Sequence, residues 1–313
     1  MLPPTRETLR VRVLIGMLAA GVVLVLSACT SAPVSAPSAA VAVPAQQQEA
    51  TYPGVERISN LSYAAAGGQS QKLDVCLPPD AVIAPNTRPA IVVVHGGSWR
   101  GGDKAHQRMQ EICRWLASEG YVAASVNYRL APAVTFPAQI VDVRAAVRWL
   151  REPTQAARFA IDPARIGALG ESAGGNLAAL LGTEGKGPLD VGTRVAAVVD
   201  LSGPVDLTSA GEATSDFRKV QLSYLGCSSY AHCPVARVAS PVYRVDPTDP
   251  PFFIAHSAHE FIPLAQASEF VAALRAQDIA TTFVVKPGSK HAAVMLDDPL
   301  RAQIVDFFRK KLG

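Results

Sequence analysis

The sequence predicts an α/β domain in which helices cover both faces of a mostly parallel sheet. Apolar runs of strand length, such as Ala90–Val94, alternate with longer segments of helical periodicity, such as Pro137–Leu150. The strand-like runs are continuously apolar, which is typical of parallel strands buried on both faces. The chain has 313 residues, of which 49% are hydrophobic and 18% charged, enough for one sizeable core.

The expected elements follow one another from about residue 90 to the C-terminus. The expected strands are Ala90–Val94, Val122–Val126, Ile166–Leu169, Val195–Leu201, Phe252–Ala255 and Thr282–Val285. The expected helices are Pro137–Leu150, Ala173–Leu181, Pro263–Ala276 and Pro299–Lys311. The polar, cysteine-bearing segment 208–240 lies between two strands, and we expect it to form either a small lid or cap or an ordinary surface excursion.

The N-terminal 50 residues differ in composition from the rest. A basic start and the apolar run Val13–Leu26 indicate a secretory signal over residues 1–28, and the run is short for a membrane span. The sequence Leu-Ser-Ala-Cys at its end resembles the lipobox of bacterial lipoproteins, which implies a lipid on Cys29. The alternative is an ordinary cleaved signal with an incidental cysteine. Residues 29–50 are rich in Ala, Pro and Ser and predict a tether before a domain at 51–313.

These features predict an exported, membrane-anchored protein that faces the extracytoplasmic side of the cell envelope. The chain has five cysteines, so four remain after Cys29, and an oxidising compartment favours their pairing. A local disulfide between Cys227 and Cys233 is plausible. Cys76 and Cys113 would then either pair or remain buried thiols. The net charge of +3, without a basic stripe, gives no reason to expect a nucleic-acid partner.

The first motif that indicates chemistry is the run Gly170–Gly175, with the sequence Gly-Glu-Ser-Ala-Gly-Gly. It matches G-x-S-x-G, the nucleophile elbow, and lies between an expected strand and an expected helix, as that motif requires. The glycines allow a sharp turn that exposes the Ser172 hydroxyl above the sheet. The helix N-terminus behind Ser172 favours developing negative charge.

A second motif follows the strand Ala90–Val94 and reads His95-Gly96-Gly97-Ser98-Trp99. Small residues here can expose backbone N–H groups to an oxyanion, beside the N–H of Ala173 after the nucleophile. We expect His95 to order this loop rather than to transfer protons.

Four spaced motifs together resemble the hormone-sensitive-lipase-like and feruloyl-esterase-like bacterial esterases. They are His95-Gly96-Gly97, Tyr128-Arg129-Leu130-Ala131-Pro132, Asp162-Pro163 and Gly170–Gly175, and the similarity extends from about Leu73 to the C-terminus. The resemblance implies an α/β-hydrolase fold and cleavage of carboxylic esters. We expect a small-molecule ester substrate and no cofactor. It also implies an oxyanion hole formed by the N–H groups of Gly97, Ser98 and Ala173, with Ser98 where many members have a third glycine.

The chain order in this fold is serine, acid, histidine. His291 follows the strand Thr282–Val285 and is the expected general base. The family usually has an Asp four residues before a proline, but here His259 stands there, before Pro263. Three alternatives stay open: Glu260 is the acid, Asp206 is the acid, or the acid is missing.

Other residues in these loops allow further interpretations. His256, His259 and Glu260 lack the helical spacing of a zinc site, so we expect no metal. The aromatic residues Trp99, Tyr128 and Phe136 either line an acyl or alcohol pocket or belong to the core.

The sequence therefore predicts a serine hydrolase that cleaves esters through an acyl-enzyme on Ser172. Two other functions remain possible on the same residues. One is a peptidase or amidase of the same fold, and the other is an impaired, membrane-tethered binding module, which His259 suggests. The oligomeric state is left open.

Overall fold

The structure, a computed structural model, describes residues 52–64, 71–79, 88–208 and 214–313, all of which belong to one compact unit. The expected signal at 1–28, Cys29 and the tether at 29–50 lie outside the described residues. Among the helices that are described, none is both long enough and apolar enough to cross a membrane.

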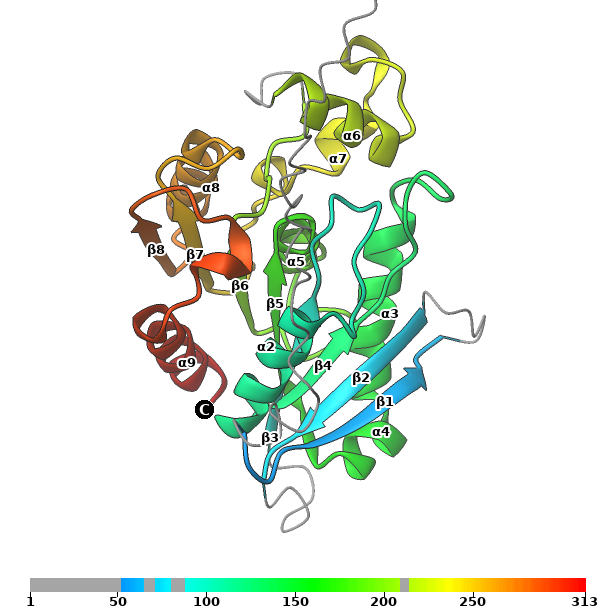
Figure 1. Ribbon diagram of the computed structural model, residues 1–313, viewed down its shortest axis with the longest axis vertical. Coiled ribbons are helices and arrows are strands. Elements are labelled where there is room, and N and C mark those ends of the chain that lie inside the picture. The colour runs from blue at the N-terminus through cyan, green and yellow to red at the C-terminus, as the bar shows by residue number, and fades with distance from the viewer. Residues whose placement is uncertain (1–51, 65–70, 80–87, 209–213) are drawn as a thin grey trace, which may run out of the picture. The chain divides into compact units, whose positions relative to one another are not determined.

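Eight strands form one sheet in the order β1-β2-β4-β3-β5-β6-β7-β8 (Figure 1). Their bounds are β1 Glu56–Ser62, β2 Lys72–Leu77, β3 Arg88–Val94, β4 Val122–Val126, β5 Ile161–Glu171, β6 Ala197–Leu201, β7 Phe252–Ser257 and β8 Thr281–Lys286. The pairs β1–β2 and β2–β4 are antiparallel, and the other five pairs are parallel. The expected mostly parallel sheet is confirmed.

The two antiparallel strands at one end of the sheet, β1 and β2, were not predicted from the sequence. β1 is an edge strand whose residues are mostly exposed, so it lacks the apolar run that predicts a buried strand. β2 is buried along nearly its whole length, but it is short and begins with a polar residue.

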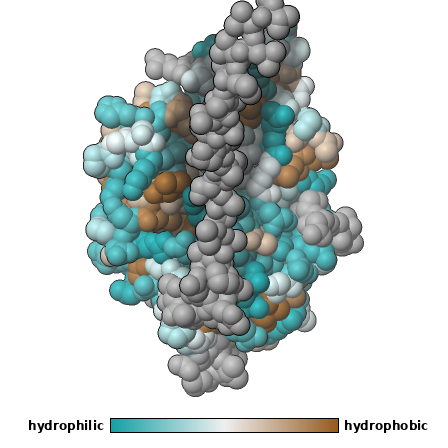
Figure 2. All heavy atoms as spheres, in the orientation of Figure 1, coloured by the Kyte–Doolittle hydropathy of each residue, from teal (hydrophilic) through white to brown (hydrophobic). Residues whose placement is uncertain are grey.

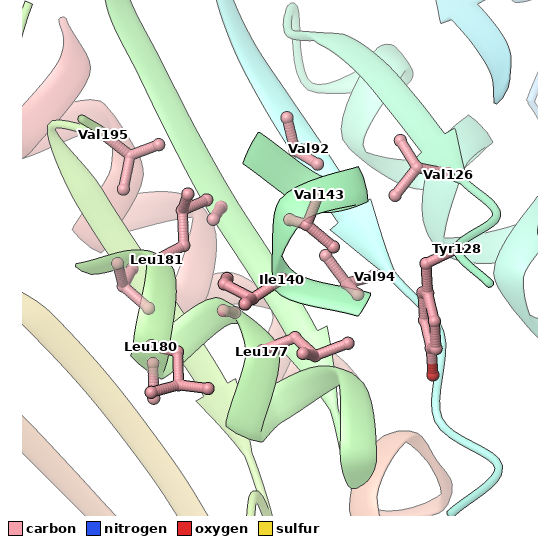
Figure 3. Close-up of a cluster of buried hydrophobic side chains, with 14 of the residues drawn as sticks. Val92, Val94, Val126, Tyr128, Ile140, Val143, Leu177, Leu180, Leu181 and Val195 are labelled. Carbon is pink, nitrogen blue, oxygen red and sulfur yellow. The ribbon is translucent and has the colours of Figure 1, made fainter. Parts of the chain in front are cut away.

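Helices cover both faces of the sheet and form a separate core on each. Their bounds are α2 Gln107–Ser118, α3 Ala138–Arg151, α4 Pro153–Arg158, α5 Ala173–Thr183, α6 Ser215–Leu225, α7 Val235–Val238, α8 Leu264–Ala276 and α9 Asp298–Leu312, with short 3₁₀ helices η2 Tyr230–His232, η3 Pro241–Tyr243 and η4 Ala292–Met295. One core joins α3, α5 and α8 to the sheet, and Figure 3 shows Leu177 of α5 and Ile140 of α3 beside Val94 of β3. The other core joins α2 and α9 to the opposite face.

Within the segment 208–240, the described residues 214–240 contain α6, η2 and α7. Its helix α6 packs Tyr224 against Trp99 of the loop after β3, with ring centroids 4.2 Å apart and nearly parallel planes. This segment therefore caps the loop that follows β3. Over the face in Figure 2, hydrophobic residues occur in small patches among hydrophilic ones.

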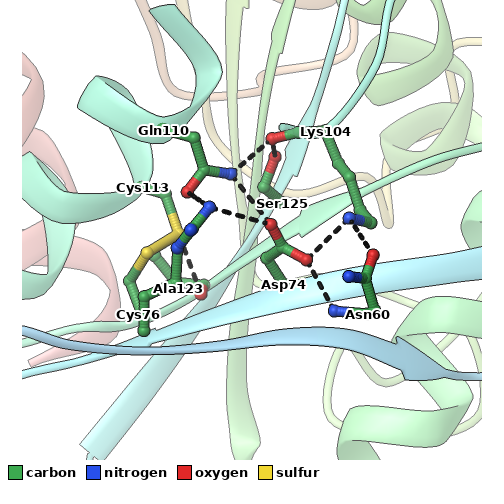
Figure 4. The surroundings of a disulfide bond; sticks show 9 residues. Asn60, Asp74, Cys76, Lys104, Gln110, Cys113, Ala123 and Ser125 are labelled. Carbon is green, nitrogen blue, oxygen red and sulfur yellow. Dashed lines mark hydrogen bonds and ion pairs between the residues drawn. A yellow bond between two sulfur atoms is a disulfide. The ribbon is translucent and has the colours of Figure 1, made fainter. Parts of the chain in front are cut away.

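Two disulfides are present in the described part of the chain. Cys227 pairs with Cys233 as expected, and Cys76 pairs with Cys113, which settles the alternative left open. The second bond joins β2 to α2 beside a buried ion pair in which Lys104 Nζ lies 2.7 Å from the Asp74 carboxylate (Figure 4). The side chains of both ions are nearly inaccessible, so this part of the fold depends on their remaining paired.

Candidate active site

Ser172 occupies the sharp turn between β5 and α5. Its φ of 53° and ψ of −121° lie outside the regions that L-residues prefer, and such strain is common at functional sites. A Cβ on Gly170 would lie 2.0 Å from the Gly174 carbonyl oxygen, and a Cβ on Gly174 would lie 2.1 Å from that of Val94. The glycines of the motif are therefore required by close backbone approach, which brings α5 against the end of β3.

His291 immediately precedes η4, after β8, and contacts the Ser172 side chain. Its Nε2 lies 2.8 Å from Ser172 Oγ, which is hydrogen-bonding distance. Its Nδ1 faces the Glu260 carboxylate oxygen Oε2. A proton on Nδ1 bonded to a carboxylate leaves the lone pair of Nε2 directed at the serine hydroxyl.

The Glu260 side chain is fully buried at the end of β7. Its Oε1 accepts hydrogen bonds from Ser202 Oγ at 2.6 Å and from the Ser257 N–H at 3.1 Å. Burial raises the pKa of Glu260, but the hydrogen bonds from His291 and Ser202 outweigh it, so the net pKa lies below its ordinary value. Glu260 is therefore ionised at neutral pH, as a partner for an imidazolium must be.

Neither the residue at the family's usual acid position, His259, nor the alternative acid, Asp206, contacts His291 through a described hydrogen bond. His259 is exposed, and its backbone N–H donates to the Gly288 carbonyl at 3.0 Å. The Asp206 carboxylate is buried, and its described partners are the Thr208 N–H at 2.8 Å and the Tyr243 hydroxyl at 2.9 Å. Of the candidate acids, Glu260 is the one in contact with His291.

The loop after β3 lies directly against the elbow. Gly97 has a φ of 111° and Ser98 a φ of 56°, so the chain turns sharply where the oxyanion donors are expected. A Cβ on Gly96 would lie 3.1 Å from the Ser172 Cβ. The predicted donors Gly97, Ser98 and Ala173 thus come from two loops that meet at Ser172.

The Glu171 carboxylate joins two loops of the site by hydrogen bonds, a role that was not predicted from the sequence. Its Oε1 accepts from the Gly96 N–H at 3.1 Å, and its Oε2 accepts from the Ala293 N–H at 3.3 Å. One carboxylate therefore links the oxyanion loop to the loop that holds His291. Its place before the serine of G-x-S-x-G was the signal that could have indicated it.

His95 has the ordering role expected of it. Its ring stacks on Tyr128 with centroids 4.3 Å apart, and its Nδ1 lies 2.7 Å from the Gly96 carbonyl oxygen. Burial lowers the pKa of His95 below its ordinary value, so the ring is neutral at neutral pH.

The three aromatic residues considered at the sequence level are core residues. Trp99, Tyr128 and Phe136 are 0%, 1% and 7% exposed. Trp99 lies 6.3 Å from Phe217 of α6 between ring centroids, and Phe217 makes an edge contact with Phe261.

Phe261 is the aromatic side chain that reaches the site. Its ring is 4.3 Å from that of His291, yet 45% of the residue is exposed. No sequence motif marks Phe261, which adjoins Glu260 and forms an apolar wall beside the imidazole.

His256 is part of the support of the acid. Its Nε2 lies 2.9 Å from the Ile262 carbonyl oxygen and 3.3 Å from Glu260 Oε1. Within the described ranges, no group of three or more His, Cys, Asp or Glu residues could hold a metal ion.

Comparison with known proteins identifies the family. The BD-FAE family model matches residues 73–274. The chain belongs to the BD-FAE family. The resemblance to hormone-sensitive-lipase-like and feruloyl-esterase-like proteins is thereby confirmed, as is the α/β-hydrolase fold.

Relatives of this BD-FAE member include two mycobacterial proteins. The chain is 33% identical over 248 residues to "Esterase LipQ" of Mycobacterium tuberculosis, covering 76% of this chain. It is 34% identical over 239 residues to "Esterase LipC" of the same organism, covering 73% of this chain. The chain spans 58% of the length of each of these relatives.

A solved structure, "Truncated form of carbohydrate esterase from gut microbiota", superposes with a TM-score of 0.70 at 26% identity. The match covers 82% of this BD-FAE member and 96% of that chain.

Proposed function

We propose that this chain is a carboxylesterase that forms an acyl-enzyme on Ser172, with His291 as general base and Glu260 as the acid. The observation that supports this most directly is the continuous contact from Ser172 Oγ through the His291 ring to the Glu260 carboxylate. The relatives LipQ and LipC are named esterases, which supports ester hydrolysis as the reaction.

In the proposed reaction, His291 Nε2 takes the hydroxyl proton as Ser172 Oγ attacks the ester carbonyl. The imidazolium that forms is stabilised by Glu260, which is buried and ionised. His291 then returns the proton to the leaving alcohol. His291 next takes a proton from water, which attacks the acyl-enzyme and releases the carboxylic acid product and free Ser172.

The tetrahedral oxyanion would be held by the N–H groups of Gly97, Ser98 and Ala173. The positive φ angles of Gly97 and Ser98 and the close approach of Gly96 to Ser172 support this assignment. Donors fixed in advance need no reorganisation as charge develops, and losing one typically costs about 10²–10³ in rate.

The two other functions make different predictions for one experiment. The full chain, purified in detergent, is assayed with p-nitrophenyl esters of increasing acyl length, with the corresponding p-nitroanilides as amide substrates and with a fluorophosphonate probe, beside a Ser172→Ala variant. We expect turnover and labelling by the wild type and neither by the variant. A folded wild type that does neither would favour the binding module, and one that labels but cleaves only amides would favour a peptidase or amidase.

We further propose that the protein is anchored in the cell envelope by a lipid on Cys29. The support is the sequence alone: a signal-like segment at 1–28 and a cysteine in a lipobox-like context. In cells fed an alkyne analogue of palmitate, the wild type should carry the label and be recovered in the membrane fraction. A Cys29→Ser variant that remained labelled and membrane-bound would contradict the anchor.

A further inference from the structure

Ser202 lies where the strands that position the site meet. It follows β6 directly, is 1% exposed, and donates its backbone N–H to the Ala255 carbonyl of β7 at 2.9 Å. The preceding Leu201 accepts a hydrogen bond from the Ser172 N–H at 2.8 Å. Ser202 is therefore placed between the strand end that bears the nucleophile and the strand that leads to the acid.

The Ser202 hydroxyl makes two hydrogen bonds that join separate loops. Its proton is donated to Glu260 Oε1 at 2.6 Å, and its oxygen accepts from the Ala292 N–H at 3.1 Å. Ala292 immediately follows His291 in the chain. A single hydroxyl thus connects the loop of the acid to the loop of the base.

These bonds decide which oxygen of Glu260 faces His291. Ser202 and the Ser257 N–H both donate to Oε1, so Oε2 is the oxygen at His291 Nδ1. A Glu side chain has three rotatable bonds, and its position depends on such donors more than that of a shorter Asp. Hydrogen bonds to an ionised group are also the stronger ones.

We propose that Ser202 is a positioning residue for the catalytic acid, which fixes the Glu260 carboxylate and thereby the orientation of His291. This inference rests on the proposed function. It predicts that the Ser202 hydroxyl contributes to turnover through Glu260, and that its contribution disappears when Glu260 can no longer serve as the acid.

Two substitutions remove the hydroxyl in different ways. Ser202→Ala keeps a Cβ at a φ of 55°, whereas Ser202→Gly accepts that φ without strain. A common effect of both variants therefore belongs to the hydroxyl and not to the backbone. Ser240→Ala is the matched control, because Ser240 is equally buried and its hydroxyl bridges the Leu207 N–H and the Ala236 carbonyl at 2.7 Å each.

The experiment is a double-mutant cycle on the full chain, with kcat, KM and the rate of fluorophosphonate labelling as readouts. We expect Ser202→Ala and Ser202→Gly each to lower kcat about 10- to 100-fold, the size of losing a hydrogen bond to a charged group, with KM changed less than about threefold. In a Glu260→Gln background, the same substitutions at Ser202 should lower kcat by less than a further factor of about three, because the effects of residues that act as one unit are not additive. Ser240→Ala should leave kcat within about threefold of the wild type.

The outcomes separate this inference from the function on which it rests. A wild type that neither turns over nor labels overturns both. An active wild type with unchanged Ser202 variants overturns the role of Ser202 alone. The role of Ser202 is also overturned if Ser202→Gly remains folded by circular dichroism but lowers kcat as much in the Glu260→Gln background as in the wild type. The Ser202 hydroxyl would then act independently of Glu260.

Discussion

The Glu260 carboxylate contacts Nδ1 of His291 from the position next to His259. His259 points to solvent, whereas the Glu260 side chain is fully buried. The acid therefore lies one residue later than the Asp that the family usually has. Its side chain is one methylene longer than that of Asp, and it reaches the imidazole. The site contains a complete serine–histidine–carboxylate chain of contacts, which argues against a missing acid.

Shortening that side chain should be almost as damaging as removing its charge. Glu260→Asp withdraws the carboxylate by one methylene, and we expect kcat to fall about 10²–10⁴-fold, approaching the loss in Glu260→Gln. Steady-state kinetics with p-nitrophenyl butyrate measures the loss, with circular dichroism as the test of folding.

The matched control for Glu260→Gln adds an aspartate at position 259, where the family usually has one. Because the side chain at 259 is exposed, His259→Asp should not restore turnover to Glu260→Gln. Recovery of activity in that double variant would show that the loop can present an acid from either position.

Removing the charge of Asp206 should affect stability rather than catalysis. Asp206→Asn keeps an oxygen for the Thr208 N–H but disturbs the bond from the Tyr243 hydroxyl. We expect kcat within about threefold of the wild type and a free energy of unfolding lower by about 1 kcal/mol, measured by urea denaturation. A loss of kcat by orders of magnitude in a folded variant would instead make Asp206 the acid.

The sequence predicted those parts of the site that depend on local backbone chemistry. The elbow around Ser172 and the loop at Gly97 need glycine at fixed spacing, and such needs are visible in a sequence. Whether the site contains an acid depends on whether the Glu260 side chain turns inward. That orientation depends on hydrogen-bond donors such as Ser202, which follows another strand. No single-sequence pattern records such a contact.

The same reasoning explains what was missed in the fold. β1 is largely exposed and has no continuous apolar run to predict it. The pairing of Cys76 with Cys113 depends on β2 lying beside α2, 37 residues further along the chain. Trp99 and Phe136 proved to be core residues because Tyr224 of α6 packs against both rings, a contact between distant segments that the sequence alone does not show.

The buried carboxyl of Asp200 should make the free energy of unfolding depend on pH. Asp200 of β6 accepts from the Gly203 N–H at 2.7 Å, and burial raises its pKa to about 7, from an ordinary value of 3.8. Because the folded pKa is the higher one, the stabilisation is fully present below about pH 4 and is lost as the pH rises through about 7. The loss could reach about 4 kcal/mol, at about 1.4 kcal/mol for each pKa unit.

Asp200→Asn removes this titration but keeps an oxygen for Gly203. Urea denaturation should find the variant and the wild type closest at about pH 4, with the variant gaining relative stability up to about pH 8. A difference that stayed constant over this range would mean that Asp200 does not titrate in the folded protein.

The disulfide between Cys227 and Cys233 should stabilise the cap and, through it, the oxyanion loop. It closes a loop directly after α6, whose Tyr224 stacks on Trp99, the neighbour of Ser98. Replacing both cysteines with alanine removes a constraint worth at most about 2 kcal/mol for so short a loop. We expect a lower melting temperature and a kcat several-fold below the wild type.

Tyr224 supplies the control for this coupling. Among the described residues its buried hydroxyl has no hydrogen-bond partner, so Tyr224→Phe should keep both the stacking and the activity. Tyr224→Ala removes the ring from Trp99 and should reproduce the loss of kcat seen without the disulfide. If Tyr224→Ala stayed fully active while folded, the cap would stabilise the domain without influencing the oxyanion loop, and the kinetic part of the disulfide prediction would be wrong.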